Sequence, residues 1–329
     1  MSVAVAAPRC AFAAALTIAA ALALLALLSL AVGTPTLSPA QLLNAVAGGG
    51  PAWLHPLITQ IRGPRLLAAL VVGAALGVSG ALLQTLARNH LAGPDVIGLN
   101  DGALLALAIS LIASPAGMIG PWWCALLGAL ATAGLVLAAA GGVGTQGYRV
   151  LIVGIGVASL LRAGFDIALS SLPIMHAGSI YAFSVGSLSG RTLNPSLIAA
   201  GVFALLMGAS LPLSRVLALM GLQDDSIRNL GVDLDRLRLL VLVLAAALAG
   251  LAVSVSGPIG FVAIAAPILA RRWAASARVA LGVSALIGAS LVVAADTLGR
   301  VIAVPAELPA GVVCGLFGGP FLLRLLLRR

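Results

Sequence analysis

Two apolar stretches of the chain each contain a pair of oppositely charged residues, and the two members of each pair are four residues apart. Arg162 precedes Asp166, and Asp296 precedes Arg300. Residues four apart share one face of a helix, so each pair can neutralise itself, whereas a lone charge at mid-bilayer costs about 2.5–3.5 kcal/mol by the lower estimates. Arg162 and Asp166 form either a buried, self-satisfied pair or a polar patch on a transport pathway. In a stand-alone, proton-driven transporter, Asp166 or Asp296 would carry the proton.

The other reactive residue types form no catalytic or metal-binding pattern. All 18 basic residues are arginine, so the chain cannot supply the lysine of a conventional P-loop. No HExxH motif, GxSxG motif or CxxC pair occurs. The isolated cysteines and histidines are expected to be packing or loop residues: Cys10, Cys124, Cys314, His55, His90 and His176. We predict no catalytic residue, no metal site and no cofactor in this chain.

Composition indicates the kind of structure that must position these charges. Hydrophobic residues make up 61% of the 329 residues, charged residues make up 8%, and mean hydropathy is +1.18. A soluble domain carries about 25% charged residues. Long apolar runs without alternation predict helices, because backbone polar groups in lipid must be satisfied internally. The net charge of +9 comes from arginines scattered over short loops, which argues against nucleic-acid binding.

The chain is predicted to be an all-α, polytopic membrane bundle that forms a single domain over 1–329. A transmembrane helix needs about 20 mostly apolar residues. Ten candidate spans lie near 11–32, 65–86, 95–113, 119–140, 150–172, 194–214, 236–256, 258–271, 279–299 and 307–326. The run 258–271 is short and contains Pro267, so nine spans is the nearest rival count. The first run exceeds the ~7–15 apolar residues of a signal peptide and is expected to be retained.

The distribution of arginines predicts the orientation in the membrane. With ten spans and a cytoplasmic N-terminus, Arg162 lies within a span and four arginines lie outside: Arg62, Arg65, Arg191 and Arg300. The other thirteen lie inside: Arg9, Arg88, Arg149, Arg215, Arg228, Arg236, Arg238, Arg271, Arg272, Arg278, Arg324, Arg328 and Arg329. This excess follows the positive-inside rule and predicts that both termini are cytoplasmic.

Small residues recur at intervals of four in the second and the last apolar runs. They are Gly73, Gly77 and Ala81, followed by Gly311, Gly315 and Gly319. Such stripes let helix backbones approach closely in lipid. Helix packing is the favoured interpretation, and faces that line a pathway are the alternative.

The stretch 215–238 is the most polar part of the chain and is predicted to be a cytoplasmic loop. Its apolar residues recur at spacings near three and four, which predicts one or two short amphipathic helices outside the lipid. Asp224 is placed to cap such a helix and Gly231 to end it. Connections between packed helices need only about 2–8 residues, so the extra length indicates a docking surface.

Three segments, in this order, resemble the permease subunit of bacterial ABC importers for iron chelates and vitamin B12. They read RGPRLLAALVVGAALGVSGALLQTLARNHLAGPDVIGLNDGA over 62–103, QDDSIRNLGVDLDRLR over 223–238, and SGPIGFVAIAAPILAR followed by ADTLGRVIAVPAELPAGVVCGLFGGPFL near the C-terminus. The resemblance extends from about residue 37 onward. The chain departs from the family pattern at His90, where proline is usual, and at Ile268, where histidine is usual.

The resemblance implies that several chains share the work of transport. The permease is expected to dimerise with a second copy or a related chain on two cytoplasmic ATPases that use ATP and Mg²⁺. A periplasmic or extracellular binding protein would deliver an iron–siderophore, haem or cobalamin-type chelate for alternating-access import across the bacterial inner membrane. The residues implied in coupling to the ATPase are Gln223, Asp224, Asp225, Ser226, Arg228, Asn229 and Gly231.

The resemblance also implies that Arg62, Arg65 and Arg300 dock acidic residues of the binding protein. Helix stability does not account for the first two, because cations at a helix N-terminus oppose its dipole by about 0.3–1 kcal/mol each. The alternative is that they are interfacial anchors whose charged ends reach water.

Overall fold

The computed structural model describes residues 8–46, 49–114, 119–142, 147–274, 281–303 and 306–327, and within these ranges it contains helices, turns and loops but no strand. The longer helices are α1 (Pro8–Ala31), α4 (Gly63–Leu86), α6 (Leu99–Ala113), α7 (Trp122–Ala140), α8 (Gly147–Ser171), α9 (Ile174–Ser184), α10 (Leu193–Ser210), α13 (Leu234–Ser256), α14 (Val262–Ala274), α15 (Leu281–Ile302) and α16 (Ala310–Leu327). The shorter ones are α2 (Pro39–Val46), α3 (Leu54–Pro56), the π-helix η1 (Leu57–Arg62), α5 (Pro94–Ile97), α11 (Leu213–Leu217), the 3₁₀ helix η2 (Ala218–Gly221) and α12 (Asp224–Asn229).

Helices fall at the apolar runs read from the sequence. Among the described residues, six helices are long and apolar enough to cross a membrane: Leu54–Leu86, Trp122–Ala140, Tyr148–Ser171, Leu193–Ser210, Leu234–Ser256 and Leu281–Ile302. The shorter apolar helices are Ala15–Ala31, Leu99–Ala113, Val262–Arg271 and Ala310–Phe321. The run 258–271, expected to be incomplete, has a helix only from Val262 and keeps Pro267 inside it. The first residues of the run 279–299 lie outside the described ranges.

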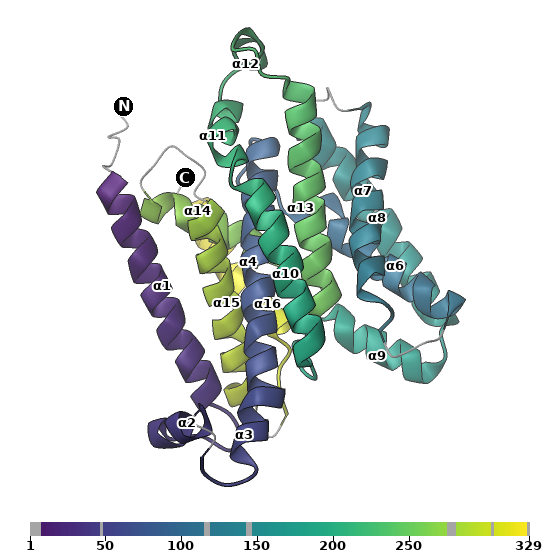
Figure 1. The fold of residues 1–329 in the computed structure, drawn as a ribbon. Helices are drawn as coiled ribbons and strands as arrows, with labels where there is room; N and C mark the ends of the chain where they lie inside the picture. Colours follow the sequence, from purple (N-terminus) through teal and green to yellow (C-terminus); the bar gives the residue numbers. More distant parts are fainter. Residues whose placement is uncertain are drawn as a thin grey trace.

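The helices form two groups that share α13. In the first group, α1, α10, α13, α14 and α15 surround α4, and α16 packs on α15 (Figure 1). In the second group, α6, α7 and α8 pack together, and α13 contacts both α6 and α7. The two chain ends and α12 lie at one end of the bundle, which we call the α12 end, and α2 and α3 lie at the other, the α2 end (Figure 1).

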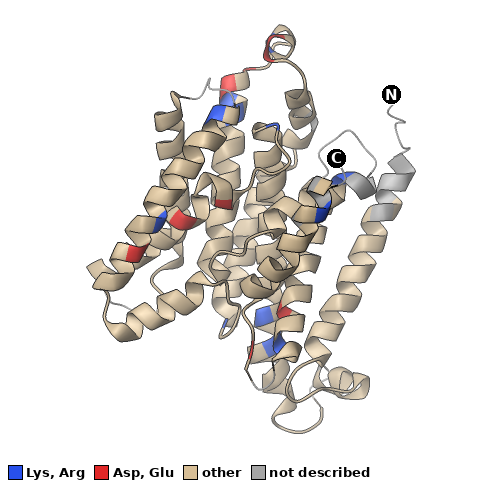
Figure 2. Ribbon diagram, turned by 180° about the vertical axis from the view of Figure 1, so that it is seen from behind, with Lys and Arg blue, Asp and Glu red and all other residues tan. Residues whose placement is uncertain are grey.

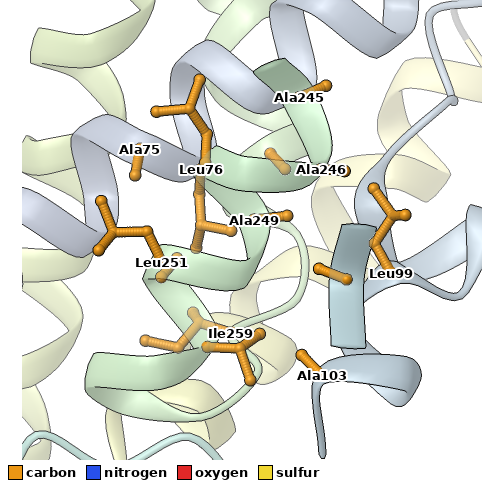
Figure 3. Packing of buried hydrophobic residues seen from close by; sticks show 14 of the residues in the cluster. Ala75, Leu76, Leu99, Ala103, Ala245, Ala246, Ala249, Leu251 and Ile259 are labelled. Carbon is orange, nitrogen blue, oxygen red and sulfur yellow. The ribbon is translucent and has the colours of Figure 1, made fainter. Parts of the chain in front are cut away.

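Helix α4 lies at the centre of the bundle, and many of its residues are glycine or alanine. Of its most apolar 18-residue window, 83% is buried, against 17% for α8 and α10. Alanines of α4 and α13 belong to one buried cluster at this centre, among them Ala75, Ala245 and Ala249 (Figure 3). Short side chains let the two backbones approach closely, which in lipid favours helix association through van der Waals contact.

The two small-residue stripes behave differently. A Cβ at Gly73 would overlap the carbonyl of Gly288 on α15, and one at Gly77 would overlap the carbonyl of Ser284. Only glycine therefore permits this approach of α4 to α15. The stripe on α16 lacks such a partner along most of its length: Gly311 meets the Val185 carbonyl, but a Cβ at Gly315 or Gly319 meets nothing within 4 Å.

The run 95–113 is not one continuous helix. Gly98, with φ +82°, separates α5 from α6 in a left-handed conformation that glycine adopts readily. A Cβ at this position would lie 2.7 Å from Cα of Ala158, so α8 packs directly against the break. A further helix, α9, fills the predicted loop between the runs 150–172 and 194–214 (Figure 1).

Candidate functional site

Charged residues gather toward both ends of the bundle and in one smaller group at mid-height (Figure 2). At the α2 end, Asp296 of α15 lies between two arginines. Arg65 of α4 donates to Asp296 from Nε at 3.0 Å and from Nη2 at 2.9 Å, and its Nη1 lies 2.6 Å from Glu307. Arg300 Nε lies 3.3 Å from the same Asp296 carboxylate. We call these four residues the outer cluster; the sequence indicated the Asp296–Arg300 pair but not Arg65 or Glu307 as their partners.

Two arginines at the α2 end bind the C-terminus of α1. Arg62 donates from Nη1 to the Leu30 carbonyl at 2.7 Å, and Arg300 donates from Nη1 to the Ser29 carbonyl at 3.0 Å. The last carbonyls of a helix lack intrahelical partners and attract cations. Arg62 is 5% exposed and Arg300 is 8% exposed. The structure thus brings Arg62, Arg65 and Arg300 to one end but directs their guanidinium groups into the chain, so none is a free surface charge.

The mid-height group joins α6 and α8. Arg162 Nε lies 3.7 Å from Asp166 on its own helix, and Arg162 Nη1 lies 3.9 Å from Asp101 on α6. The guanidinium also stands 5.3 Å from the centre of the Phe165 ring. The side chains of Arg162 and Asp166 are 47% and 60% exposed in the single chain. These long contacts and high exposure do not describe a pair buried between helices of this chain.

Three charges from distant segments meet at the α12 end. Arg88 Nη2 donates to Asp224 Oδ1 at 2.7 Å, and Arg238 Nη2 donates to Asp224 Oδ2 at 2.8 Å. We call Arg88, Asp224 and Arg238 the inner cluster. Burial opposes ionisation of Asp224, but the hydrogen bonds from Arg238 and Arg88 hold the pKa of its carboxyl below the usual range. The carboxylate therefore stays ionised, and these contacts keep their strength, until the pH falls below the ordinary range of an aspartate.

The sequence placed Arg88 and Arg238 only as topology signals, because nothing in a one-dimensional pattern pairs residues separated by 136 positions. Asp224 was expected to cap a helix, and here the structure differs. Gln223 occupies the N-cap position without a side-chain cap bond, and Asp224 is the first helical residue. Its side chain binds Arg88 through one carboxylate oxygen and Arg238 through the other. Gly231 ends the segment as expected, with φ +77° and its N–H donating to the Arg228 carbonyl at 2.9 Å.

The rest of α12 presents a polar surface. Ile227 is fully buried and anchors the helix. The other predicted coupling residues are exposed: Gln223, Asp225, Ser226, Arg228, Asn229 and Gly231. A cleft of about 680 Å³ lies beside them, between the end of α4, the start of α8 and α12, with Asn89, Tyr148 and Asp225 on its walls. Among the described residues, no group of three His, Cys, Asp or Glu side chains is arranged to hold a metal ion.

Known proteins resemble the chain over nearly its whole length. Residues 21–328 match the model of the FecCD transport family. The ferric enterobactin transport system permease protein FepG of Escherichia coli is 36% identical over 90% of each chain. The hemin transport system permease protein HmuU of Yersinia pestis is 35% identical over 84% of this chain and 83% of its own.

The fold resembles that of a solved transporter. A structure of a metal-chelate type ABC transporter in an inward-facing conformation superposes with a TM-score of 0.85 and 26% identity, covering 96% of this chain and 99% of that one. Members of the matched family are transport permease subunits, and the apolar helices described above fit a multi-pass membrane protein. A family match over residues 21–328, relatives at about 35% identity and a shared helical fold agree: the chain belongs to the FecCD transport family.

Proposed function

We propose that this protein is the non-catalytic permease subunit of an ATP-driven importer that carries an iron chelate into the cytoplasm by alternating access. The observation that carries the proposal is the exposed polar face of α12. A transporter that worked alone would not need a short helix held at the end of the bundle with almost its whole polar face in solvent. A chain without lysine also needs a partner to hydrolyse ATP through a P-loop.

The reported relatives support an iron chelate as the cargo. FepG belongs to a ferric enterobactin transport system and HmuU to a hemin transport system. The two are about equally similar to this chain, at 36% and 35% identity. A ferric citrate permease of E. coli, FecC, is 35% identical over 86% of this chain. We therefore favour an iron–siderophore, iron–citrate or haem cargo over a cobalamin. Large chelates contact a cavity through many weak interactions, and the binding protein is expected to choose among them.

The proposal assigns partners to the two ends of the bundle. The α12 end, with Gln223, Asp225 and Arg228, would face two cytoplasmic ATPases that bind ATP and Mg²⁺. The α2 end would face a periplasmic or extracellular binding protein. A second permease, identical or related, would complete the pathway within the inner membrane. Ten spans with both termini in the cytoplasm follow from this arrangement and from the arginine distribution.

The docking role of Arg62, Arg65 and Arg300 stays a prediction. Because the three guanidinium groups already bind acceptors within the chain, a partner carboxylate would have to share or displace an internal contact. Of the two carboxylates that bind these arginines, Glu307 is the more accessible, with a side chain 44% exposed. Docking through Arg65 would therefore compete with Glu307 and not with Asp296, whose side chain is 3% exposed.

A stand-alone, proton-coupled transporter is the rival proposal. A proton carrier must release and rebind its proton during each cycle. Asp296 lies between Arg65 and Arg300, and only 3% of its side chain is exposed, so water has little access to its carboxylate. The side chain of Asp166 is 60% exposed in the single chain. The family to which the chain belongs and the matching ABC transporter fold favour the ATP-driven importer.

Reconstitution distinguishes the two. The permease, its cognate ATPase and its binding protein are placed in vesicles, and the uptake of iron–siderophore, iron–citrate and haem is measured with ATP inside or outside. We expect accumulation of one chelate class only when ATP and all three components are present. Accumulation driven by a pH gradient without the ATPase would overturn the proposal in favour of the carrier.

A further inference from the structure

Asp224 connects helix α12 to α4 and α13, the two most buried of the six long apolar helices. Its carboxylate receives Arg88 on one oxygen and Arg238 on the other. Arg88 follows the end of α4, and Arg238 lies in the first turns of α13. A single aspartate therefore ties three segments that are 136 and 14 residues apart in sequence.

Arg88 holds the loop before α12 as well. Its Nε donates to the Met220 carbonyl at 2.7 Å, and its Nη2 donates to the Leu222 carbonyl at 2.6 Å. Arg88 adopts φ +50°, a left-handed backbone conformation that residues other than glycine rarely adopt. Such a conformation persists when surrounding contacts determine it. One guanidinium thus fixes the chain from residue 220 to residue 224.

The inner cluster supplies two ion pairs that join α12 to the ends of α4 and α13. Helix α12 is also held by the buried side chain of Ile227 and by the connecting segments 221–223 and 230–233. Gly221 and Gly231 in these connectors have nothing within 4 Å of a Cβ position, so the connectors are not packed at these points. A force applied to α12 would bend these connectors unless a direct contact transmitted the force to the core helices.

We propose that Asp224 is a positioning residue that transmits movement of α12 to α4 and α13 through Arg88 and Arg238. The inference rests on the proposed coupling function of α12, and it separates the residues of that segment into two roles. The exposed residues contact the ATPase, whereas Asp224 faces inward and keeps α12 rigidly attached to the helices that must move. Without Asp224 the docking surface of α12 is still present, but its movement no longer reaches α4 and α13.

The test compares two Asp→Asn variants in the same loop. Asp224→Asn removes the charge and leaves one acceptor oxygen where two arginines need two. Asp233→Asn is the matched control: Asp233 caps α13 by accepting from the Arg236 N–H, and asparagine caps a helix equally well. Asp224→Glu and Arg88→Lys keep the charges and test whether geometry matters.

Three quantities are measured in the reconstituted complex: ATPase copurified per permease, ATP hydrolysed, and chelate accumulated per ATP. For Asp224→Asn we expect unchanged copurification and an accumulation per ATP reduced about tenfold, the loss corresponding to one hydrogen bond to a charged group. Asp224→Glu should recover part of the lost accumulation per ATP, and Asp233→Asn should accumulate as much chelate per ATP as the wild type. Deuterium exchange in the isolated permease should rise over 223–231 in Asp224→Asn only.

Each outcome separates the inference from the proposed function. If the wild-type permease binds no ATPase, the proposed function fails. If the ATPase binds and Asp224→Asn accumulates chelate per ATP like the wild type, the transmission role fails while the importer stands. Loss of copurification in Asp224→Asn would also overturn the inference, because Asp224 would then belong to the docking surface. Unchanged deuterium exchange would show that the inner cluster does not hold α12.

Discussion

The side chain of Asp296 shows how one residue organises the outer cluster. It accepts from Arg65 at 2.9 and 3.0 Å and lies 3.3 Å from Arg300, while only 3% of its side chain is exposed. Removing one member of a buried ion pair leaves the other charge uncompensated. Two arginines contact this carboxylate, and the second of them, Arg300, also binds the end of α1.

We therefore predict that Asp296→Asn lowers the free energy of unfolding by about 3–5 kcal/mol. Thermal unfolding of the purified protein in detergent measures the change. Glu307→Gln is the matched control, since it removes a carboxylate from the same Arg65 at a half-exposed position and should cost only about 0–1 kcal/mol. Equal, small effects of the two variants would contradict the buried role of Asp296.

Arg162 supports a second prediction at this scale. A guanidinium that is 47% exposed at mid-height of a membrane helix does not face lipid without a large penalty, so we predict that it faces water on the transport pathway. In a chain whose three cysteines are replaced by serine, Arg162→Cys should react quickly with a water-soluble thiol reagent. Leu160→Cys, on the other side of α8, serves as the control and should react more slowly. Equal reaction rates of the two cysteine variants would contradict the prediction that Arg162 faces the pathway.

At the scale of elements, the sequence located the helices better than it located their contacts. The apolar runs predicted α4 and α13 within two residues, because lipid imposes both length and hydropathy. The break at Gly98 was missed, since a lone glycine in an apolar run is common and only the approach of α8 requires it. Arg88 and Asp224 could not be paired, because contacts between helices depend on rotations and offsets that a single sequence does not encode.

The two glycine stripes give a prediction about elements. In an exposed helix position, alanine is more favourable than glycine by about 1 kcal/mol. Gly73→Ala should nevertheless destabilise the protein by about 1–3 kcal/mol, because its Cβ would overlap the Gly288 carbonyl and separate α4 from α15. Gly315→Ala, with open space around it, should be neutral or stabilising in the monomer. Thermal unfolding in detergent compares them, and the reverse order would contradict the packing described.

For the whole molecule, the arrangement of charge indicates how the bundle sits in the membrane. The inner and outer clusters occupy opposite ends, with the mid-height group between them (Figure 2). The chain ends and α12 share one end (Figure 1). Thirteen of the arginines, including those of the inner cluster, belong to segments predicted to lie inside, so the opposite orientation would invert the positive-inside bias.

This orientation predicts which surfaces an impermeant thiol reagent reaches. Leu43 on α2 and Ser226 on α12 are both exposed, and they lie at opposite ends of the bundle. In the cysteine-free chain expressed in spheroplasts, Leu43→Cys should be labelled directly, and Ser226→Cys only after the membrane is permeabilised. Because both sites are accessible in the folded chain, burial does not explain a difference between them. Labelling of Ser226→Cys in intact spheroplasts would place α12 outside the cell, where no ATPase could reach it.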